Sequence, residues 1–208
     1  MNSVMQKRVV IAVVVVAVLA VAALVARQWL AERHASQQLP VNTRMGGDFI
    51  LPSTQGRPLD TRTLRGKVVL LNFGFASCPD VCPLVLARMK AAVKALGDDA
   101  ASVQGVFVSF DPARDTVANL KVYVEHFHPG FIGATGSEAE IAAVAARYGV
   151  VYLKENTGSA SGYGFAHSDY IYLIDAEGHV RKLYGGDAKT DEIARDIRLL
   201  QAADHPLF

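Results

Sequence analysis

Two continuous apolar runs constrain the fold of this chain more than any other feature. Residues 67–73 (KVVLLNF) and 103–110 (VQGVFVSF) have the pattern of strands that are buried on both faces. Residues 83–96 between them predict a helix, because Pro83 suits its first position and Gly97 follows its end. A strand–helix–strand crossover makes the two strands parallel. The core is therefore predicted to be an α/β sheet.

The segments around this unit add hairpins and further helices. The predicted β-hairpins join residues 48–51 to 57–59 and residues 170–175 to 180–184. Three further helices are expected: one from Asp115 or Thr116 to 127, one over 137–148 that begins with a Ser137–Glu140 capping box, and one over 190–200. Short extended pieces are expected at 131–133 and 150–154. Residues 155–166 are rich in Gly and Ser and predict a mobile loop. This order is typical of a thioredoxin-like α/β sandwich with an N-terminal β-hairpin extension.

An apolar run near the N-terminus, residues 9–26, contains no charge, Gly or Pro. At about 1.5 Å rise per residue it is long enough to cross the hydrocarbon core of a bilayer. The alternative is a cleaved signal peptide, whose apolar core is usually only about 7–15 residues long. Because long C-terminal domains translocate largely regardless of charge, we expect a cytoplasmic N-terminus (1–8), a single transmembrane helix (9–26), a tether (27–45) and an exported domain (46–208).

Charge and cysteine content exclude several classes of function. The net charge is +1 and the basic residues are scattered, so nothing indicates nucleic acid binding. The two cysteines, Cys78 and Cys82, are too few for a disulfide scaffold. Outside the cytoplasm a close pair of thiols tends to oxidise unless a metal or a reductant holds it. The pair is therefore expected to have a chemical role.

Residues that bear reactive groups are predicted to meet at one edge of the sheet. Cys78 and Cys82 follow the first apolar run and open a helix, whose N-terminus favours thiolates. Asp111 follows the second run, and His167 is expected to enter an antiparallel strand at its start. Ligands bind at this carboxyl edge in open α/β sheets. Asp111 and Arg114 are therefore candidates to lie beside the two cysteines and the histidine.

Two thiolates and one imidazole form a soft to borderline set of metal donors. The sulfurs suit Cu(I), and the imidazole makes the set suitable for Cu(II) as well. Zinc would accept the same three ligands with water in the fourth position, although a structural zinc site normally has four protein ligands. The donor set formed by Cys78, Cys82 and His167 favours copper and leaves zinc as the alternative.

The sequence around these residues resembles the signature of the Sco/SenC copper chaperones. The matching segments are residues 66–83 (GKVVLLNFGFASCPDVCP), 108–116 (VSFDPARDT), 133–136 (GATG) and His167 before 171–175 (IYLID). The resemblance implies a thioredoxin fold, a single membrane anchor, and copper bound by Cys78, Cys82 and His167. It further implies that the chain delivers copper to the binuclear copper site of cytochrome c oxidase, or readies that site by a thiol–disulfide step.

The resemblance also implies partners and a location. The expected partners are the copper-site subunit of the oxidase, another copper chaperone or a thiol reductant, and the expected location is a bacterial inner membrane with the domain in the periplasm. One position departs from the family pattern, because Ala166 stands where members often have an acidic residue before the histidine. The partner of the His167 ring is therefore open, with Asp169 as one candidate.

Two other functions are compatible with the fold class. A thiol–disulfide oxidoreductase would normally have Cys-x-x-Cys spacing, and it would not need His167. A peroxidase of the peroxiredoxin type would need a Thr shortly before the reactive cysteine, but residues 75–77 are Phe, Ala and Ser. His126 and His128 form His-x-His beside a proline and are expected on a solvated surface. Tyr163 and Phe165 are candidates to shield the site.

Overall fold

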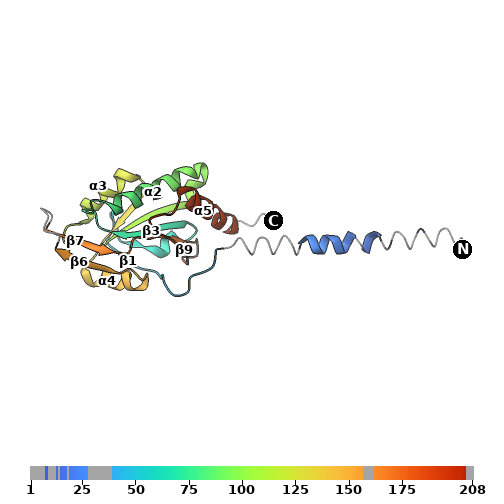
Figure 1. Cartoon of the computed structure of the whole chain (residues 1–208), viewed down its shortest axis with the longest axis horizontal. Helices are drawn as coiled ribbons and strands as arrows, with labels where there is room; N and C mark the ends of the chain where they lie inside the picture. Colours follow the sequence, from blue (N-terminus) through green and yellow to red (C-terminus); the bar gives the residue numbers. More distant parts are fainter. Residues whose placement is uncertain are drawn as a thin grey trace. The chain divides into compact units, whose positions relative to one another are not determined.

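A computed structural model describes residues 8, 13, 15–17, 19–27, 39–156 and 162–204 (Figure 1). The chain divides into two units, residues 1–38 and 39–208, and the described residues of the first are helical. No helix among the described residues is long and apolar enough to cross a membrane. The predicted span, residues 9–26, includes residues 9–12, 14 and 18, which lie outside the described part of the chain. The transmembrane anchor therefore stays a prediction.

A five-stranded mixed sheet forms the centre of the second unit. Its strands lie in the order β5 (Ile132–Ala134), β4 (Val103–Ser109), β3 (Val68–Gly74), β8 (Ile171–Ile174) and β9 (Val180–Tyr184). The first three are parallel to one another, β8 is antiparallel to β3, and β9 is antiparallel to β8. Every residue of β3 is buried, as its apolar run predicts. The strand–helix–strand crossover predicted from the sequence is confirmed.

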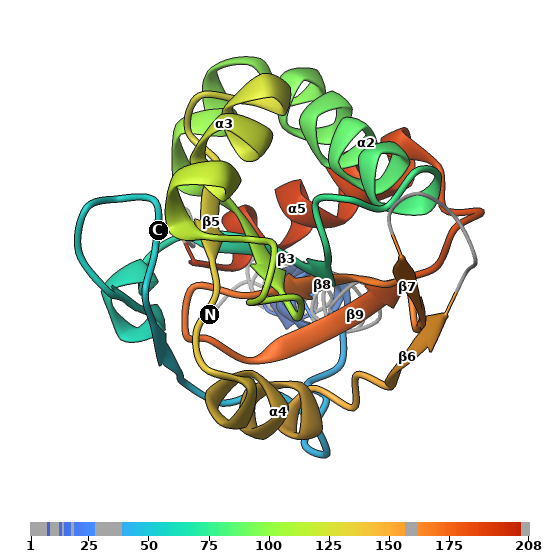
Figure 2. The same cartoon turned by 90° about the vertical axis from the view of Figure 1, so that its left-hand side faces the viewer.

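Helices cover both faces of this sheet. Figure 2 shows α2 (Val81–Ala95), α3 (Val117–Phe127) and α5 (Thr190–Asp204) on one face and α4 (Glu138–Arg147) on the other. The hairpin of β1 (Ile50–Leu51) and β2 (Leu59–Asp60) packs into the same core as α4. Successive residues of β3 alternate between the two cores, because side chains along a strand point to opposite faces. The result is a thioredoxin-like sandwich with an N-terminal hairpin, as predicted.

Side-chain caps set the starts of α3 and α4. The hydroxyl of Thr116 accepts a hydrogen bond from the backbone N–H of Asn119 (3.2 Å), so Thr116 rather than Asp115 caps α3. Ser137 and Glu140 form the predicted capping box at the start of α4. Two 3₁₀ helices, η1 (Thr61–Leu64) and η2 (Gly97–Ser102), were not predicted because such short turns lack an apolar period.

The predicted loop over residues 155–166 is wrong for the part that the structure describes. β6 (Tyr152–Asn156) pairs antiparallel with β7 (Tyr163–His167), and the two strands form a sheet of their own. The glycines and serines suggested a loop, but Tyr163, Phe165 and His167 alternate with small residues as in a strand. The Gly and Ser content of the segment therefore favoured a loop, whereas the alternation of large and small residues over 163–167 correctly indicated a strand.

Part of the predicted tether belongs to the globular unit. The Asn42 N–H donates to the carbonyl of Val180 (2.7 Å), and the Arg181 Nε–H donates to the carbonyl of Leu39 (2.9 Å). Both bonds involve residues of β9, Val180 and Arg181. β9 is an edge strand of the five-stranded sheet, so its outer side is open to pairing with this segment. The unit accordingly starts at residue 39 rather than 46.

Candidate metal centre

Cys82 lies inside the first turn of α2. The helix begins at Val81 with Asp80 at its N-cap, so Cys82 precedes Pro83 within the helix. The predicted start at Pro83 is therefore two residues late. Proline fits anywhere in the first turn, because the first N–H groups of a helix have no partner within the helix. This start directs the Cys82 sulfur toward the end of β3.

Both sulfurs are shielded from water. Cys82 is 1% exposed and Cys78 is 9% exposed, and neither is in a disulfide. The last residue of β3, Gly74, makes room for Cys82, since a Cβ at this position would lie 2.8 Å from the Cys82 Sγ and 2.9 Å from a Phe107 ring carbon. A larger residue at Gly74 would displace the sulfur. The packing of β3 therefore fixes where Cys82 sits.

A buried carboxylate from the loop between β4 and α3, Asp115, holds the cysteine loop. Asp115 accepts hydrogen bonds from the Ala76 N–H (2.8 Å) and from the Ser109 hydroxyl (2.5 Å). Burial raises the pKa of Asp115, against the lowering effect of these hydrogen bonds. From the sequence, Asp115 was expected only as a helix cap. No local pattern indicates this contact, because its two partners lie on different elements.

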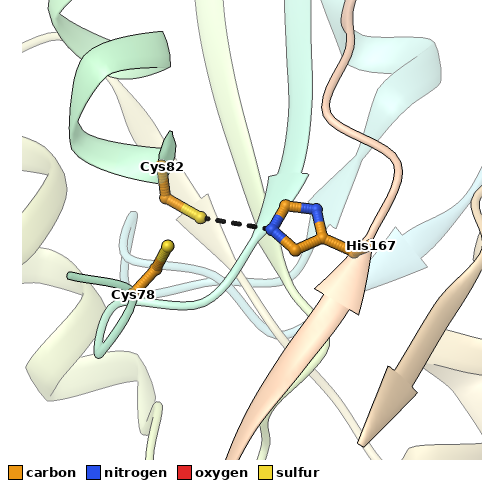
Figure 3. Close-up of side chains that lie close together, drawn as sticks. All are labelled: Cys78, Cys82 and His167. Atoms are coloured by element: carbon orange, nitrogen blue, oxygen red, sulfur yellow. Dashed lines mark hydrogen bonds between the residues drawn. The ribbon is translucent and has the colours of Figure 1, made fainter. Parts of the chain in front are cut away.

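His167 completes the group from the end of β7, not from the start of an antiparallel strand as predicted. Its Nε2 lies 3.7 Å from the Cys82 Sγ, and the ligand atoms of Cys78, Cys82 and His167 all lie within 4.8 Å of one another (Figure 3). Figure 3 shows the three side chains pointing toward a common centre. The site thus joins a loop, a helix start and a hairpin that are remote in sequence.

The orientation of the imidazole is fixed by the backbone. Nδ1 of His167 lies 2.9 Å from the carbonyl oxygen of Ser168, and since a carbonyl only accepts, Nδ1 carries the hydrogen. The neutral ring therefore presents its Nε2 lone pair to the sulfurs. Such an outer hydrogen bond orients a metal-binding histidine. The Ser168 carbonyl is therefore the hydrogen-bond partner of the ring that an acidic residue at position 166 was expected to supply. Asp169, the other candidate, interacts with the ring only through its charge.

Aromatic rings enclose the imidazole. Phe110 and Phe75 lie edge-on to His167, with ring centroids 5.1 and 6.0 Å away, respectively. Phe165 packs against both phenylalanines, at 5.1 Å from Phe110 and 5.2 Å from Phe75. This shell lowers the local dielectric and limits access of water, which strengthens interactions among the polar groups inside it. Phe165 thus occupies the shielding position considered from the sequence.

The two cysteines share one proton. A hydrogen bond from the Cys82 thiol lowers the pKa of Cys78 to about 3, although burial opposes this shift. The same hydrogen bond and burial raise the pKa of Cys82. Burial works to lower the pKa of His167, but the Cys78 thiolate and the Ser168 carbonyl outweigh it, so this pKa is raised. The site is thus a thiolate, a thiol and an imidazole, and a soft cation would displace the shared proton.

Asp111 and Arg114 do not join the converging ligand atoms. The Asp111 carboxylate accepts a hydrogen bond from the Arg114 Nε–H (2.5 Å) and another from the Tyr163 hydroxyl (2.7 Å). The Arg114 guanidinium lies 5.8 Å from the centroid of the Phe75 ring. Both residues are at the predicted edge of the sheet, but their side chains face β7 instead of the sulfurs.

Among the described residues, one other group has ligand atoms close enough to hold a cation. It comprises Asp175, Glu177 and His179 in the turn between β8 and β9. The Asp175 carboxylate already accepts hydrogen bonds from the N–H groups of Glu177 and His179 and from Arg181. The group is therefore explained as turn structure. His126 and His128 belong to neither group.

Comparison with known proteins agrees with this geometry. Residues 37–202 match the family model described as SCO1/SenC. The chain belongs to the SCO1/SenC family. An "SCO2-like protein" of Rickettsia felis is 39% identical over 158 residues, which are 76% of this chain and 77% of that protein. The family resemblance inferred from the cysteine motif is therefore confirmed.

Solved structures of family members share the fold. A structure titled as Arabidopsis thaliana ScoI with copper bound has a TM-score of 0.71 and 37% identity, and covers 76% of this chain and 98% of that chain. Bradyrhizobium japonicum ScoI, also described with copper bound, has a TM-score of 0.69 and 36% identity, over 75% of this chain and 99% of that chain. BsSco, whose structure is described as that of a member of the Sco family of cytochrome c oxidase assembly proteins, has a TM-score of 0.62 but only 22% identity, so this match adds the shared fold alone.

Proposed function

We propose that this chain is a copper chaperone that binds one copper ion through Cys78, Cys82 and His167. The observation that carries the proposal is the convergence of two sulfurs and a tautomer-fixed imidazole nitrogen within 4.8 Å of one another. Related proteins of the family have been solved with copper bound. Two thiolates suit Cu(I), and the added imidazole suits Cu(II). Zinc fits the donors less well, because a structural zinc site normally has a fourth protein ligand.

The recipient and the location form the second part of the proposal. We infer delivery of copper to the copper-site subunit of cytochrome c oxidase, because the family is described by its role in assembly of that oxidase. We also infer a single membrane anchor over residues 9–26 in a bacterial inner membrane, with the domain in the periplasm. The anchor is supported by the sequence of this segment, which contains no charge, Gly or Pro over 18 residues.

A copper titration of the reduced whole chain, kept in detergent, tests the proposal. We expect one equivalent of Cu(I) or Cu(II) to bind, with a sulfur-to-copper charge-transfer band for Cu(II). Zinc, added in competition, should not displace Cu(I) from the two sulfurs. If the protein binds neither copper ion tightly, or binds zinc in preference, the chaperone proposal is wrong.

A thiol–disulfide oxidoreductase is the second candidate, and the charge state of Cys78 favours it. A pKa of about 3 makes Cys78 a thiolate across the neutral range, and Cys82 is close enough to resolve a mixed disulfide. The substrate would then be a disulfide in the oxidase subunit. Catalytic reduction of a peptide disulfide by the metal-free chain, with an added dithiol that reduces the Cys78–Cys82 disulfide after each turnover, would favour this candidate if it is retained after His167→Ala. A copper chaperone needs no such turnover.

A further inference from the structure

A buried carboxylate lies beside the metal centre without belonging to it. Asp111 is 2% exposed. Its Oδ2 accepts from the Arg114 Nε–H at 2.5 Å, and its Oδ1 accepts from the Tyr163 hydroxyl at 2.7 Å. A charge buried this deeply is stable only while it is paired and hydrogen-bonded. Both donors are therefore strongly bound, and one of them, Tyr163, lies on the strand that carries His167.

Tyr163 is held at several points. The Arg114 guanidinium lies 3.8 Å from the centroid of its ring, and the Lys154 Nζ lies 3.7 Å from the same centroid. Arg114 also donates from Nη1 to the Tyr163 carbonyl oxygen (3.1 Å). The hydrogen bond to Asp111 raises the pKa of Tyr163, which keeps the phenol protonated as a donor. Asp111, Arg114 and Tyr163, called the Asp111 cluster below, thus fix the first residue of β7.

The position of the first residue of β7 determines where its last residue lies. β7 runs from Tyr163 to His167 and pairs with β6 in a sheet separate from the five-stranded one. Among the described residues of the hairpin, no strand pairing with the five-stranded sheet therefore holds it in place. Residues four apart in a strand share a face and lie about 13 Å apart, at roughly 3.3 Å per residue. Anchoring Tyr163 at one end, with Phe165 packed in the middle, sets the direction in which His167 reaches the sulfurs.

We propose that Tyr163, held by Asp111 and Arg114, is a positioning residue that keeps His167 opposite Cys78 and Cys82. The effect on copper rests on the function proposed above, whereas the effect on the hairpin does not. Loss of the Tyr163 hydroxyl leaves the ring between its two cations but removes a donor from a buried carboxylate. The hairpin then opens more often, and His167 spends less time within reach of the metal.

The test compares Tyr163→Phe with Tyr152→Phe in the whole chain in detergent. Tyr152 lies on the same hairpin, and its hydroxyl has no hydrogen-bond partner among the residues that the structure describes. Hydrogen exchange of the metal-free protein should be at least about fivefold faster in β6 and β7 for Tyr163→Phe, with β3 and β4 unchanged. Cu(II) should bind about tenfold more weakly, the low end of the range for outer-shell partners. Tyr152→Phe should match the wild type in both measurements.

A double variant separates positioning from general stability. In a His167→Ala background, Tyr163→Phe should cause no further loss of Cu(II) affinity, because the group that it positions is absent. Unchanged hairpin exchange in Tyr163→Phe would overturn the proposal. So would a further tenfold loss in the His167→Ala background. If the wild type binds no copper, the proposed function fails, and the exchange measurement alone decides whether the Asp111 cluster holds the hairpin.

Discussion

Replacing Gly74 by alanine tests whether the packing of β3 sets the position of the Cys82 sulfur. The new Cβ would lie 2.8 Å from the Cys82 Sγ and 2.9 Å from Cε2 of Phe107. Favourable contacts between such atoms lie at about 3.5–4.0 Å, so the neighbours must move by roughly 0.6–1.2 Å. Gly74 does not have a positive φ, so alanine adds no backbone strain. Phe107 is fully buried, and we therefore expect much of the movement in the sulfur.

The expected cost of Gly74→Ala has two parts. Overpacking a core of this kind lowers the free energy of unfolding by about 1–3 kcal/mol. Metal–ligand distances in well-formed sites agree with standard values to about 0.2 Å. A larger shift of the Cys82 sulfur should therefore weaken Cu(II) binding by at least about tenfold and change the charge-transfer band. Urea denaturation of the metal-free protein and a Cu(II) titration measure the two effects separately.

Gly105→Ala is the matched control, because it overpacks the same sheet away from the sulfurs. A Cβ on Gly105 in β4 would lie 2.5 Å from Phe131 ring atoms. We expect a comparable loss of stability with an unchanged copper spectrum. The reasoning is refuted if Gly74→Ala loses stability like the control but binds Cu(II) with the affinity and spectrum of the wild type.

Three further predictions concern the site. His167→Ala should weaken Cu(II) binding more than Cu(I) binding, because the two sulfurs alone suit Cu(I); equal losses for the two ions would contradict this. In the metal-free protein, alkylation of Cys78 should be nearly independent of pH between 5 and 8, because a pKa of about 3 leaves it a thiolate throughout. The unfolded chain should instead react about tenfold faster per pH unit, and Cys82 should stay unreactive in the folded protein because its pKa is raised. Asp115→Ala should lower the free energy of unfolding by about 1–3 kcal/mol and speed hydrogen exchange at Ala76, whose N–H would lose its acceptor; protection at Ala76 equal to that of the wild type would show that the loop is held in another way.

The parts of the fold that the sequence predicts well are those with a strong local cause. The continuous apolar character of β3 and β4 identified both strands, and the crossover rule then fixed their parallel pairing. The capping box of Ser137 and Glu140 is likewise a local signal, and it identified the start of α4. The extended piece predicted over residues 150–154 overlaps β6, but β7 was missed because Gly164 and the glycines before it weaken the signal of a short strand.

The site was predictable to different degrees for its different members. Cys78 lies in the loop after β3 and Cys82 in the first turn of α2, and both positions follow from local rules, so their proximity to each other and to the helix start was accessible from sequence. His167 was correctly predicted to lie near the cysteines, but the reason was incorrect, because it ends β7 instead of beginning β8. Its hydrogen bond to the Ser168 carbonyl depends on backbone geometry, which no sequence pattern reports.

Asp111 shows why the correct edge does not ensure the correct contact. Its place after β4 brings it to the edge where the sulfurs lie, as the parallel pairing of β3 and β4 requires. A buried carboxylate, however, is stabilised far more by a guanidinium and a phenol at 2.5 and 2.7 Å than by a neighbouring thiolate, which would repel it. Arg114 follows three residues later in the chain and supplies the first of these donors. The charge of Cys78 thus favours a carboxylate that faces away from the metal centre and toward the hairpin that carries His167.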